Sequence, residues 1–480
     1  MLFNSIPFLI YFPVVVLLYF VIPDKMKNYW LLAASLFFYA CWNPKYLLLL
    51  LLSILLTYIT SLLVDRAKTQ GKKKVYLTLC LMCNLSILFF FKYYNFAIES
   101  ICVVFEKVGI SIAFPAFDFV LPVGISFNIF QALGYTFDVY RGDVECEKNL
   151  FKYALFVSFF PQLVAGPIER SGNLLHQFDE VHRFDAKKAQ SGLVLMMLGF
   201  FEKLVVAETA AIAANYVFAN FRQMTALQLI IGVVIFAVQI YGDFGGYSHI
   251  AIGAARVMGF ELMDNFRQPY FATSIKDIWR RWHISLSGWF RDYLYFPLGG
   301  GRKGSIRKYF NLCVVFLVSG LWHGVSWHYV FWGFVNGVYQ MLEDLWDKVT
   351  QKRIKAPKWI AVLRTFALWN IALIFFRSPS LREAFEYLWY IVVKWQEPFA
   401  GLHFSAFGFQ EVEMWIFLFG TSALWIIDYR REIGKPLGTW LCRTKAAIRW
   451  PICLVICLFI VLVAFRSFGQ GAANFIYFQF

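Results

Sequence analysis

Long apolar segments recur along this sequence and constrain its fold more than any other feature. Of its 480 residues, 60% are hydrophobic and only 16% are charged, a far more apolar balance than soluble chains have. Many of the segments approach the roughly 20 residues that a helix needs to cross a bilayer. Because the interior of a bilayer offers no water to backbone groups, such segments must form helices. The sequence therefore predicts an all-α polytopic membrane protein.

The first expected segment spans residues 6–22 and lacks both a basic leader and a small-residue cleavage site. We interpret it as a retained membrane helix rather than a signal peptide. No internal repeat or low-complexity linker interrupts the chain, which favours a single domain over residues 1–480. The further expected segments are 30–41, 46–64, 75–94, 119–140, 150–165, 191–218, 227–244, 312–342, 359–376, 412–427 and 451–465.

The charged residues lie mainly in the loops, and they predict how the chain is oriented. Residues 66–74 hold five basic residues and no acid, and residues 267–308 hold nine basic residues against two acidic ones. Loops of this kind face the cytoplasm, so the net charge of +15 indicates contact with anionic lipid rather than with nucleic acid. Residues 343–358 are also fairly basic, so segment 312–342 would begin and end on one side of the membrane. We therefore expect a broken or re-entrant hairpin with His323 near its turn.

A basic, tryptophan-rich stretch, residues 274–298, differs from the spanning segments. Ser274, with Asp277 three residues later, has the form of a helix-capping box. The spacing predicts an amphipathic helix in which Trp279 and Trp282 share the apolar face and His283 lies on the polar face. Helices of this composition lie in the membrane interface, so we expect cytoplasmic interfacial helices around 274–298.

His323 lies inside a segment, 309–342, that contains no Asp, Glu, Lys or Arg. An ionisable side chain at membrane depth is expensive and is therefore a functional candidate. Three interpretations stay open from the residues alone: a general base acting on an alcohol, an axial ligand of haem, or a packed histidine satisfied by neighbours such as Ser319 and Ser326. The same alternatives apply to His283, where packing is favoured. His328 lies five residues after His323 and thus on another helix face, and no metal-binding motif is present.

Three charged residues interrupt apolar segments: Glu202, Lys203 and Asp243. They are either a surface pair and a helix end, or the lining of a water-filled cavity, and the sequence leaves both open. A further set of basic residues is suited to holding the phosphates of a donor such as coenzyme A, although each equally fits a cytoplasmic flank. This set is Arg280, Arg281, Arg302, Lys303, Arg307 and Lys308.

The run WRRWHISLS at 279–287 resembles the signature of membrane-bound O-acyltransferases of the alginate O-acetyltransferase type. The resemblance extends to 124–127, 159–168, 291–295, 297–300, 321–324 and 475–480. It implies a ring of about 11–13 membrane helices around a thinned centre with a tunnel. It also implies that His323 is catalytic and that His283 is a second important position. Gly245, His249 and Asn128 depart from the residues expected at their positions.

The resemblance leads us to expect an O-acyltransferase of the bacterial inner membrane. It would move an acyl group, most simply acetyl, from a cytoplasmic thioester toward hydroxyls of an extracytoplasmic polysaccharide. We expect acetyl-CoA or an acyl carrier protein as donor, no permanently bound cofactor or metal, and a periplasmic or extracellular acyltransferase as partner. Transfer of D-alanine to teichoic acid from a carrier protein is the alternative within the family, and a haem protein or a transporter is the alternative outside it. For donor binding we select Trp279, Arg280, Arg281, Trp282, Ser287, Arg291, Asp243 and Trp322.

Overall fold

A computed structural model describes residues 1–110, 114–115, 117, 124–164, 166–351, 356–396, 399 and 402–468. Every regular element in this part of the chain is a helix, which confirms the predicted all-α class. Close contacts divide the chain into two compact units, residues 1–184 with 258–263 and residues 185–257 with 264–480. The single domain expected over residues 1–480 stays a prediction, because such a division does not say whether the units fold separately.

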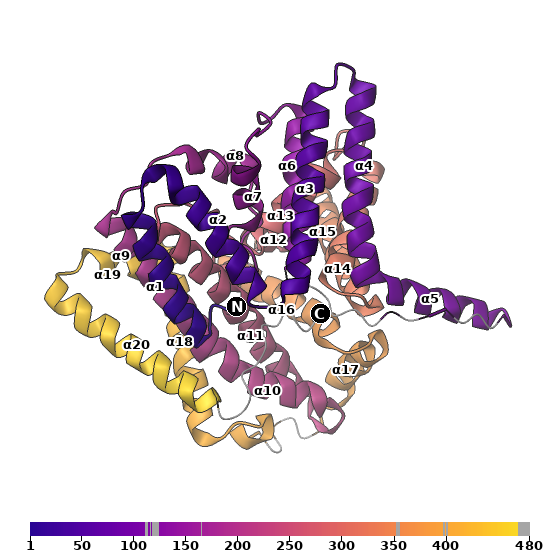
Figure 1. The fold of residues 1–480 in the computed structure, drawn as a ribbon. Coiled ribbons are helices and arrows are strands. Elements are labelled where there is room, and N and C mark those ends of the chain that lie inside the picture. The colour runs from indigo at the N-terminus through magenta and orange to yellow at the C-terminus, as the bar shows by residue number, and fades with distance from the viewer. Residues whose placement is uncertain are drawn as a thin grey trace. The chain divides into compact units, whose positions relative to one another are not determined.

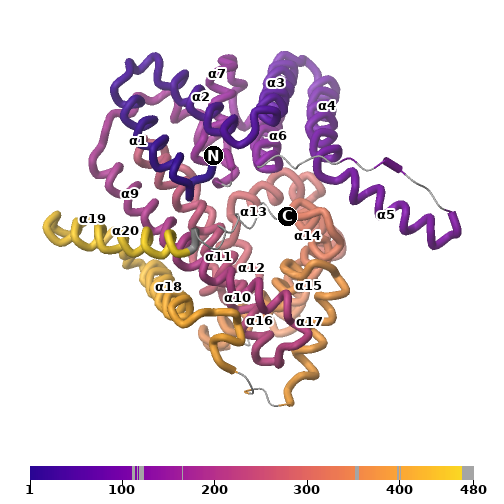
Figure 2. The backbone as a smooth tube through the Cα atoms, turned by 60° about the horizontal axis from the view of Figure 1, so that its bottom comes forward, coloured from indigo at the N-terminus to yellow at the C-terminus, as the bar shows by residue number. Residues whose placement is uncertain are grey.

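Unit 1 contains the N-terminal helices, and α3 and α4 run side by side in it (Figures 1 and 2). Buried hydroxyl groups hold these helices together: Ser61 bonds Thr136 at 3.2 Å and Tyr153 donates to Thr57 at 2.7 Å. The helices of unit 1 are α1 (Ile6–Val21), α2 (Asp24–Ala40), α3 (Pro44–Arg66), α4 (Gln70–Leu88), α5 (Tyr94–Lys107), α6 (Ile125–Arg141), α7 (Leu150–Ser158) and α8 (Ser171–Leu174).

Unit 2 contains both candidate histidines, His283 and His323. Its first helices are α9 (Ala186–Phe200), the π-helix η3 (Phe201–Ala207), α10 (Glu208–Ala219) and α11 (Ala226–Val257). The short helices α12 (Ile275–Arg281), α13 (Ile284–Phe290) and η6 (Arg291–Tyr295) follow, and then α14 (Ser305–His323) and α15 (Trp327–Val349). The last helices are α16 (Lys358–Arg377), α17 (Leu381–Val393), α18 (Glu411–Glu432), α19 (Leu437–Arg443) and α20 (Ala446–Phe468).

Helix α11 is the most enclosed long helix of unit 2. Its most apolar window is 78% buried, against 11% for that of α20. Glycines allow the close approach of α9: a Cβ on Gly192 would lie 2.6 Å from the carbonyl oxygen of Gly253, and one on Gly199 would lie 2.5 Å from that of Gly246. Two helix backbones can pack this tightly only where both carry glycine. Polar groups of α11 are thereby brought into the interior of the unit.

Six helices in the described residues are long and apolar enough to cross a membrane. The π-helix η1 (Phe89–Tyr93) joins α4 and α5 into one of these, Gln70–Lys107. The others are Pro44–Arg66, Ala226–Val257, Lys358–Arg377, Glu411–Glu432 and Ala446–Arg466. This is fewer than the 11–13 membrane helices that the resemblance implies, because several expected segments form shorter helices, such as α1 and α7. The expected segment 119–140 lies partly outside the described residues and its helix, α6, begins at Ile125. The terminal motif 475–480 lies wholly outside them.

The broken hairpin expected in 312–342 is confirmed. Helix α14 ends at His323, Gly324 is extended, and α15 begins at Trp327. The two helices pack along each other (Figure 1). The hairpin places His323 at the last residue of a helix, immediately before the turn.

Candidate functional site

The basic stretch does not form the continuous amphipathic helix that its spacing predicts. The Ser274 cap is confirmed, since its hydroxyl accepts the backbone N–H of Asp277 at 3.0 Å. The helix then ends at Arg281, and His283 takes a left-handed conformation with φ of 45° before α13 begins. This break turns His283 away from the polar face, and its side chain is fully buried. A left-handed backbone at a residue other than glycine is costly and is retained mainly at functional sites.

Asn265 holds the chain in this unusual turn. Its backbone carbonyl accepts the N–H of Ile284 at 3.0 Å, and its side-chain carbonyl accepts the hydroxyl of Ser285 at 2.9 Å. The amide nitrogen donates to Ser248 of α11 at 3.2 Å. Asn265 therefore fixes the residues that follow His283 to the buried helix α11. This role could not be predicted from the sequence, because a lone Asn in a loop has no distinctive spacing.

His323 is positioned by the close packing of α14 against α15. A Cβ on Gly333 would overlap the carbonyl oxygen of Phe316 and would lie 3.0 Å from its carbonyl carbon. A Cβ on Gly320 would likewise lie 3.0 Å from the carbonyl carbon of Tyr329. These two glycines therefore permit the close contact between the two helices of the hairpin. Ser326, named above as a neighbour that could satisfy His323, lies outside the helix of His323, because α14 ends at His323 and Ser326 immediately precedes α15.

The fold brings the two histidines together. Their ring centroids lie 6.2 Å apart, and only 4% of His323 is exposed. Phe244 of α11 packs edge-on against His283 at 4.7 Å. Trp322 contacts both imidazoles, at 5.8 Å from His283 and 5.0 Å from His323. Two titratable rings thus face each other inside an aromatic shell.

The aromatic shell continues around His323 with Trp332 at 5.0 Å and Phe376 at 5.5 Å. His283 lies outside the candidate spans, in the stretch of sequence between the third and the fourth. Burial lowers the pKa of His283 to about 3. Its imidazole is therefore neutral at pH 7, the form that can accept a proton or donate an N–H to an oxygen.

Trp279 links the basic stretch to the hairpin. Its indole N–H donates to Asn336 of α15 at 3.3 Å, and its ring packs 5.7 Å from Trp332 and 5.8 Å from Trp369 of α16. Asn336 is fully buried and in turn donates to the carbonyl of Trp332 at 2.9 Å. Trp282 also packs on Trp369, at 5.2 Å. Both tryptophans of the motif therefore support the wall of the histidine site.

The basic residues selected for donor binding differ in their surroundings. Arg281 is held by Glu432 at 2.7 Å and by Asp277 at 3.1 Å, and Arg291 pairs with Asp292 at 2.8 Å. Lys308 bonds Asp344 at 2.8 Å. Arg280 is exposed, as are Arg302, Lys303 and Arg307. Ser287 is half-buried and donates to the carbonyl of Trp282 at 3.4 Å. The donor-binding role of all these residues stays a prediction.

Asp243 does not end a helix, and Glu202 and Lys203 do not form a surface pair, so this interpretation of the three charges was wrong. All three are buried, and Asp243 lies in the middle of α11. Lys203 pairs with Asp243 at 2.6 Å and lies 3.9 Å from Glu208. Lys203 of the π-helix therefore has a charged partner from another segment, as a buried charge requires.

His249, one of the positions that depart from the family pattern, belongs to a second buried network of polar side chains. Its Nδ1 lies 2.6 Å from Glu202, and Arg431 of α18 donates to its Nε2 at 3.2 Å. Because Nε2 accepts, Nδ1 carries the proton and donates to the carboxylate. Nearby, Tyr241 donates to Asp428 at 2.7 Å. These bonds tie α18 to α11 and η3.

His328 does not join the two site histidines. It is buried in α15, and its Nδ1 lies 3.0 Å from the carbonyl oxygen of Phe375. No group of three or more His, Cys, Asp or Glu side chains in the described residues has the geometry to hold a metal ion.

Comparison with known proteins identifies the family in which this site occurs. A model of the MBOAT, or membrane-bound O-acyltransferase, family matches residues 147–381, which include both histidines. A probable alginate O-acetylase, AlgI, of Pseudomonas putida is 39% identical over 388 residues, which cover 80% of this chain and 79% of the relative. This chain belongs to the membrane-bound O-acyltransferase family. It is therefore a multi-pass membrane protein and an O-acyltransferase, as the resemblance in its motifs implied.

Other relatives act on different polymers. The peptidoglycan O-acetyltransferase of Helicobacter pylori is 34% identical over 421 residues, covering 81% of this chain and 79% of the relative. A teichoic acid D-alanyltransferase of Streptococcus thermophilus is 26% identical over 285 residues, covering 53% of this chain and 67% of the relative. The match to O-acetyltransferases is thus both closer and longer than the match to the D-alanyltransferase.

Proposed function

We propose that this enzyme moves an acetyl group from a cytoplasmic thioester toward hydroxyl groups of an extracytoplasmic polysaccharide or cell-wall glycan. The observation that carries the proposal is the pair of buried imidazoles, 6.2 Å apart in an aromatic shell, in a chain of the O-acyltransferase family. A separation of this size puts both rings within reach of one ester-sized group. The names of the alginate and peptidoglycan relatives support acetyl as the acyl group and a glycan as the acceptor.

In the proposed reaction His323 is the general base. The hydroxyl oxygen of the acceptor forms a bond to the carbonyl carbon of the thioester while the imidazole takes the hydroxyl proton. The carbon–sulfur bond then breaks, and the departing thiolate takes the proton back from the imidazolium, so that the ring is again neutral. General-base catalysis of this kind contributes about 10²–10⁴-fold.

His283 has a second role, that of holding the donor. Its neutral ring can donate a hydrogen bond to the thioester carbonyl oxygen, where negative charge develops during attack. The left-handed turn and the bonds of Asn265 fix the backbone on which this imidazole is carried. The surrounding aromatic side chains exclude water and so strengthen each of these polar contacts.

The donor is proposed to be acetyl-CoA or an acetylated carrier protein in the cytoplasm of a bacterial cell. The basic region 267–308 favours an anionic donor on that side. The acyl group would pass toward a separate periplasmic or extracellular acyltransferase, which completes transfer to the glycan. No bound cofactor or metal is needed in this scheme.

The second candidate is transfer of D-alanine from a carrier protein to teichoic acid. It is favoured by the 26% identity to a D-alanyltransferase, which spans 53% of this chain. Membranes containing the enzyme should be supplied separately with labelled acetyl-CoA, an acetylated carrier protein and a D-alanylated carrier protein. Label from either acetyl donor in a glycan hydroxyl ester supports the proposal. Label from the D-alanyl donor alone supports the second candidate.

The two alternatives outside the family, a haem protein and a transporter, can be tested in the same preparation. A haem protein would show a Soret band in the purified enzyme. A transporter would move a substrate without consuming thioester. Thioester consumption that depends on His323 separates the acyltransferase from both.

A further inference from the structure

A long apolar groove lies in unit 2 and includes neither site histidine. Its volume is about 850 Å³, and α9, α18, α19 and α20 contribute to its walls. Each of the long helices presents a stripe at three- and four-residue spacing. The stripes include Val194 and Leu198 on α9, Trp415 and Phe419 on α18, and Val455 and Phe459 on α20.

The polar side chains of the groove gather at one end. Arg256 ends the buried helix α11 and donates to Ser191 at 3.4 Å. Arg431, at the end of α18, is held by its bond to His249 at 3.2 Å. His249 precedes Arg256 by seven residues, about 10 Å along the helix, so both guanidinium groups belong to one end of the groove. None of the described residues that line it is acidic.

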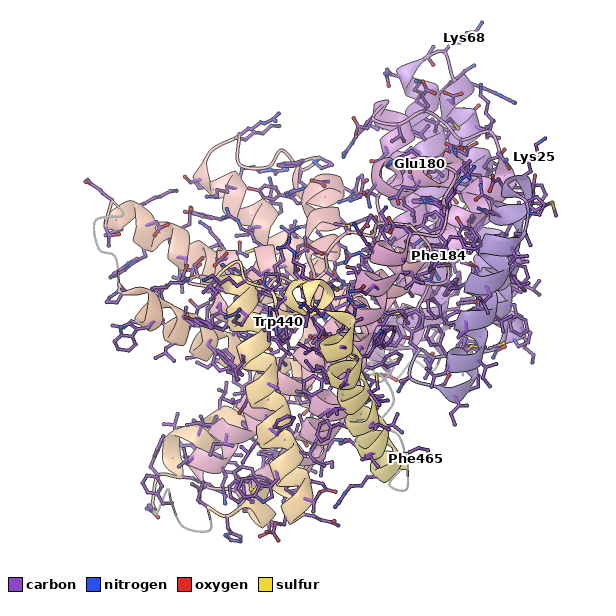
Figure 3. All side chains as sticks on the ribbon, turned by 90° about the vertical axis from the view of Figure 1, so that its left-hand side faces the viewer. Lys25, Lys68, Glu180, Phe184, Trp440 and Phe465 are labelled. Atoms are coloured by element: carbon purple, nitrogen blue, oxygen red, sulfur yellow. The ribbon has the colours of Figure 1, made fainter. Side chains whose placement is uncertain are left out.

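The rest of the groove is apolar and is long enough to hold a lipid chain. Along α18 it runs from Arg431 to Val412, nineteen residues and thus about 28 Å. One leaflet of a bilayer has a hydrocarbon depth of about 15 Å. Trp440, 53% exposed beside the arginine end, suits the interface between headgroups and chains. Figure 3 labels Trp440 in α19 and Phe465 toward the far end of α20.

The groove is open toward the outside of the unit rather than sealed in its core. Trp415 is 61% and Phe419 is 59% exposed, and α20 is the least buried of the candidate spans. Phe419 and Phe459, whose ring centroids lie 5.4 Å apart, hold α18 against α20. In a membrane an open apolar groove of this size must be filled by something that is itself apolar.

We propose that this groove binds one membrane phospholipid, with an acyl chain along α18 and α20 and its phosphate between Arg256 and Arg431. Charge complementarity selects this occupant over a plain hydrocarbon, since guanidinium groups bind phosphate by paired charge-assisted hydrogen bonds. The arginine end adjoins residues 430–449, which hold six basic residues and one acidic residue. Such a basic stretch is expected on the cytoplasmic side, so the lipid belongs to the cytoplasmic leaflet. The bound lipid stabilises the contact of α18 and α20 with α9.

The test uses the full-length protein, purified in detergent and stripped of lipid. Phosphatidylglycerol is added, and binding is measured by native mass spectrometry and by the rise in unfolding temperature. Dioleoylglycerol, which lacks the phosphate, and inorganic phosphate, which lacks the chains, are added in parallel arms. We expect phosphatidylglycerol to bind and stabilise the protein. Dioleoylglycerol should bind at least about tenfold more weakly, since a hydrogen bond to a charged group contributes that much. Inorganic phosphate should also bind at least about tenfold more weakly, because it has no acyl chain to bury in the groove.

Matched variants locate the binding. Arg256→Gln should weaken phosphatidylglycerol binding at least about tenfold, whereas Arg430→Gln, which changes a residue outside the groove, should not. Ala423→Trp should block the apolar part, whereas Ser422→Trp, on an exposed face of the same helix, should not. Equal binding by groove and control variants would overturn the proposal. So would a second polypeptide, rather than lipid, retained by the wild type and lost in Ala423→Trp.

Discussion

Replacing Gly333 by alanine tests whether close helix packing positions His323. The added Cβ would lie 3.0 Å from the carbonyl carbon of Phe316 and would overlap the attached oxygen. Carbon atoms pack best at about 3.5–4.0 Å, so α15 must move back from α14 by roughly 1 Å. Overpacking of this kind costs about 1–3 kcal/mol. A displacement of that size near reacting groups can cost about 10²-fold in rate.

Gly337→Ala is the matched control, one turn further along α15. Its Cβ would lie 3.5 Å from the nearest atom of Phe316, an ordinary contact. Alanine also favours a helix by roughly 1 kcal/mol relative to glycine, so this variant should be as stable as the wild type or slightly more so.

Two measurements compare the two variants with the wild type: the unfolding temperature in detergent and the transfer of label from acetyl-CoA in membranes. We expect Gly333→Ala to unfold at lower temperature and to lose transfer by about 10²-fold, with Gly337→Ala near wild type in both. If the two variants behave alike, the packing of α14 on α15 does not position His323.

Three further predictions concern residues around the site. Lys203→Met should destabilise the protein by about 3–5 kcal/mol, because it leaves a buried carboxylate at Asp243 without the lysine 2.6 Å away. Unfolding with denaturant measures this loss, and the double variant Lys203→Met/Asp243→Leu should recover part of it. Asn265→Ala should reduce acetyl transfer more than stability, since it frees the turn after His283, and equal loss of both would make Asn265 merely structural. Burial raises the pKa of Asp344, outside the candidate spans, but hydrogen bonds from two lysines and a tyrosine outweigh it and hold the pKa below its usual range. Its stabilising contribution is therefore complete above about pH 4 and is lost as the pH falls below that value, so the unfolding temperature of the wild type should drop there more steeply than that of Asp344→Asn.

The class of fold was predictable from the sequence because long apolar segments admit only helices in a membrane. The hairpin was also predictable, since the charge-free segment 312–342 has basic flanks at both ends. The spacing of apolar residues could not predict the break at His283. Helical periodicity continues through the motif, and the left-handed turn depends on Asn265, which lies in a separate segment of the chain.

The site was predictable in its members but not in its arrangement. His323 stood out because it lies in a charge-free segment, and His283 because of the motif around it. Their proximity depends on tertiary packing by glycines and aromatic rings, which have no distinctive pattern in one sequence. The same limit applied to Lys203 and Asp243, which pair with each other although they lie forty residues apart in the sequence.

The central claim, that His323 acts as the general base, is tested most directly by making one substitution at two buried histidines of the same hairpin. His323→Asn and His328→Asn each replace imidazole by a smaller polar group, and in His328→Asn the amide can still donate to the carbonyl of Phe375. Transfer of label from acetyl-CoA is measured in membranes holding equal amounts of each folded variant. If His323 is the general base, we expect His323→Asn to lose about 10²–10⁴-fold in transfer and His328→Asn to stay close to wild type. Wild-type transfer by His323→Asn, or equal losses in the two variants, would contradict it.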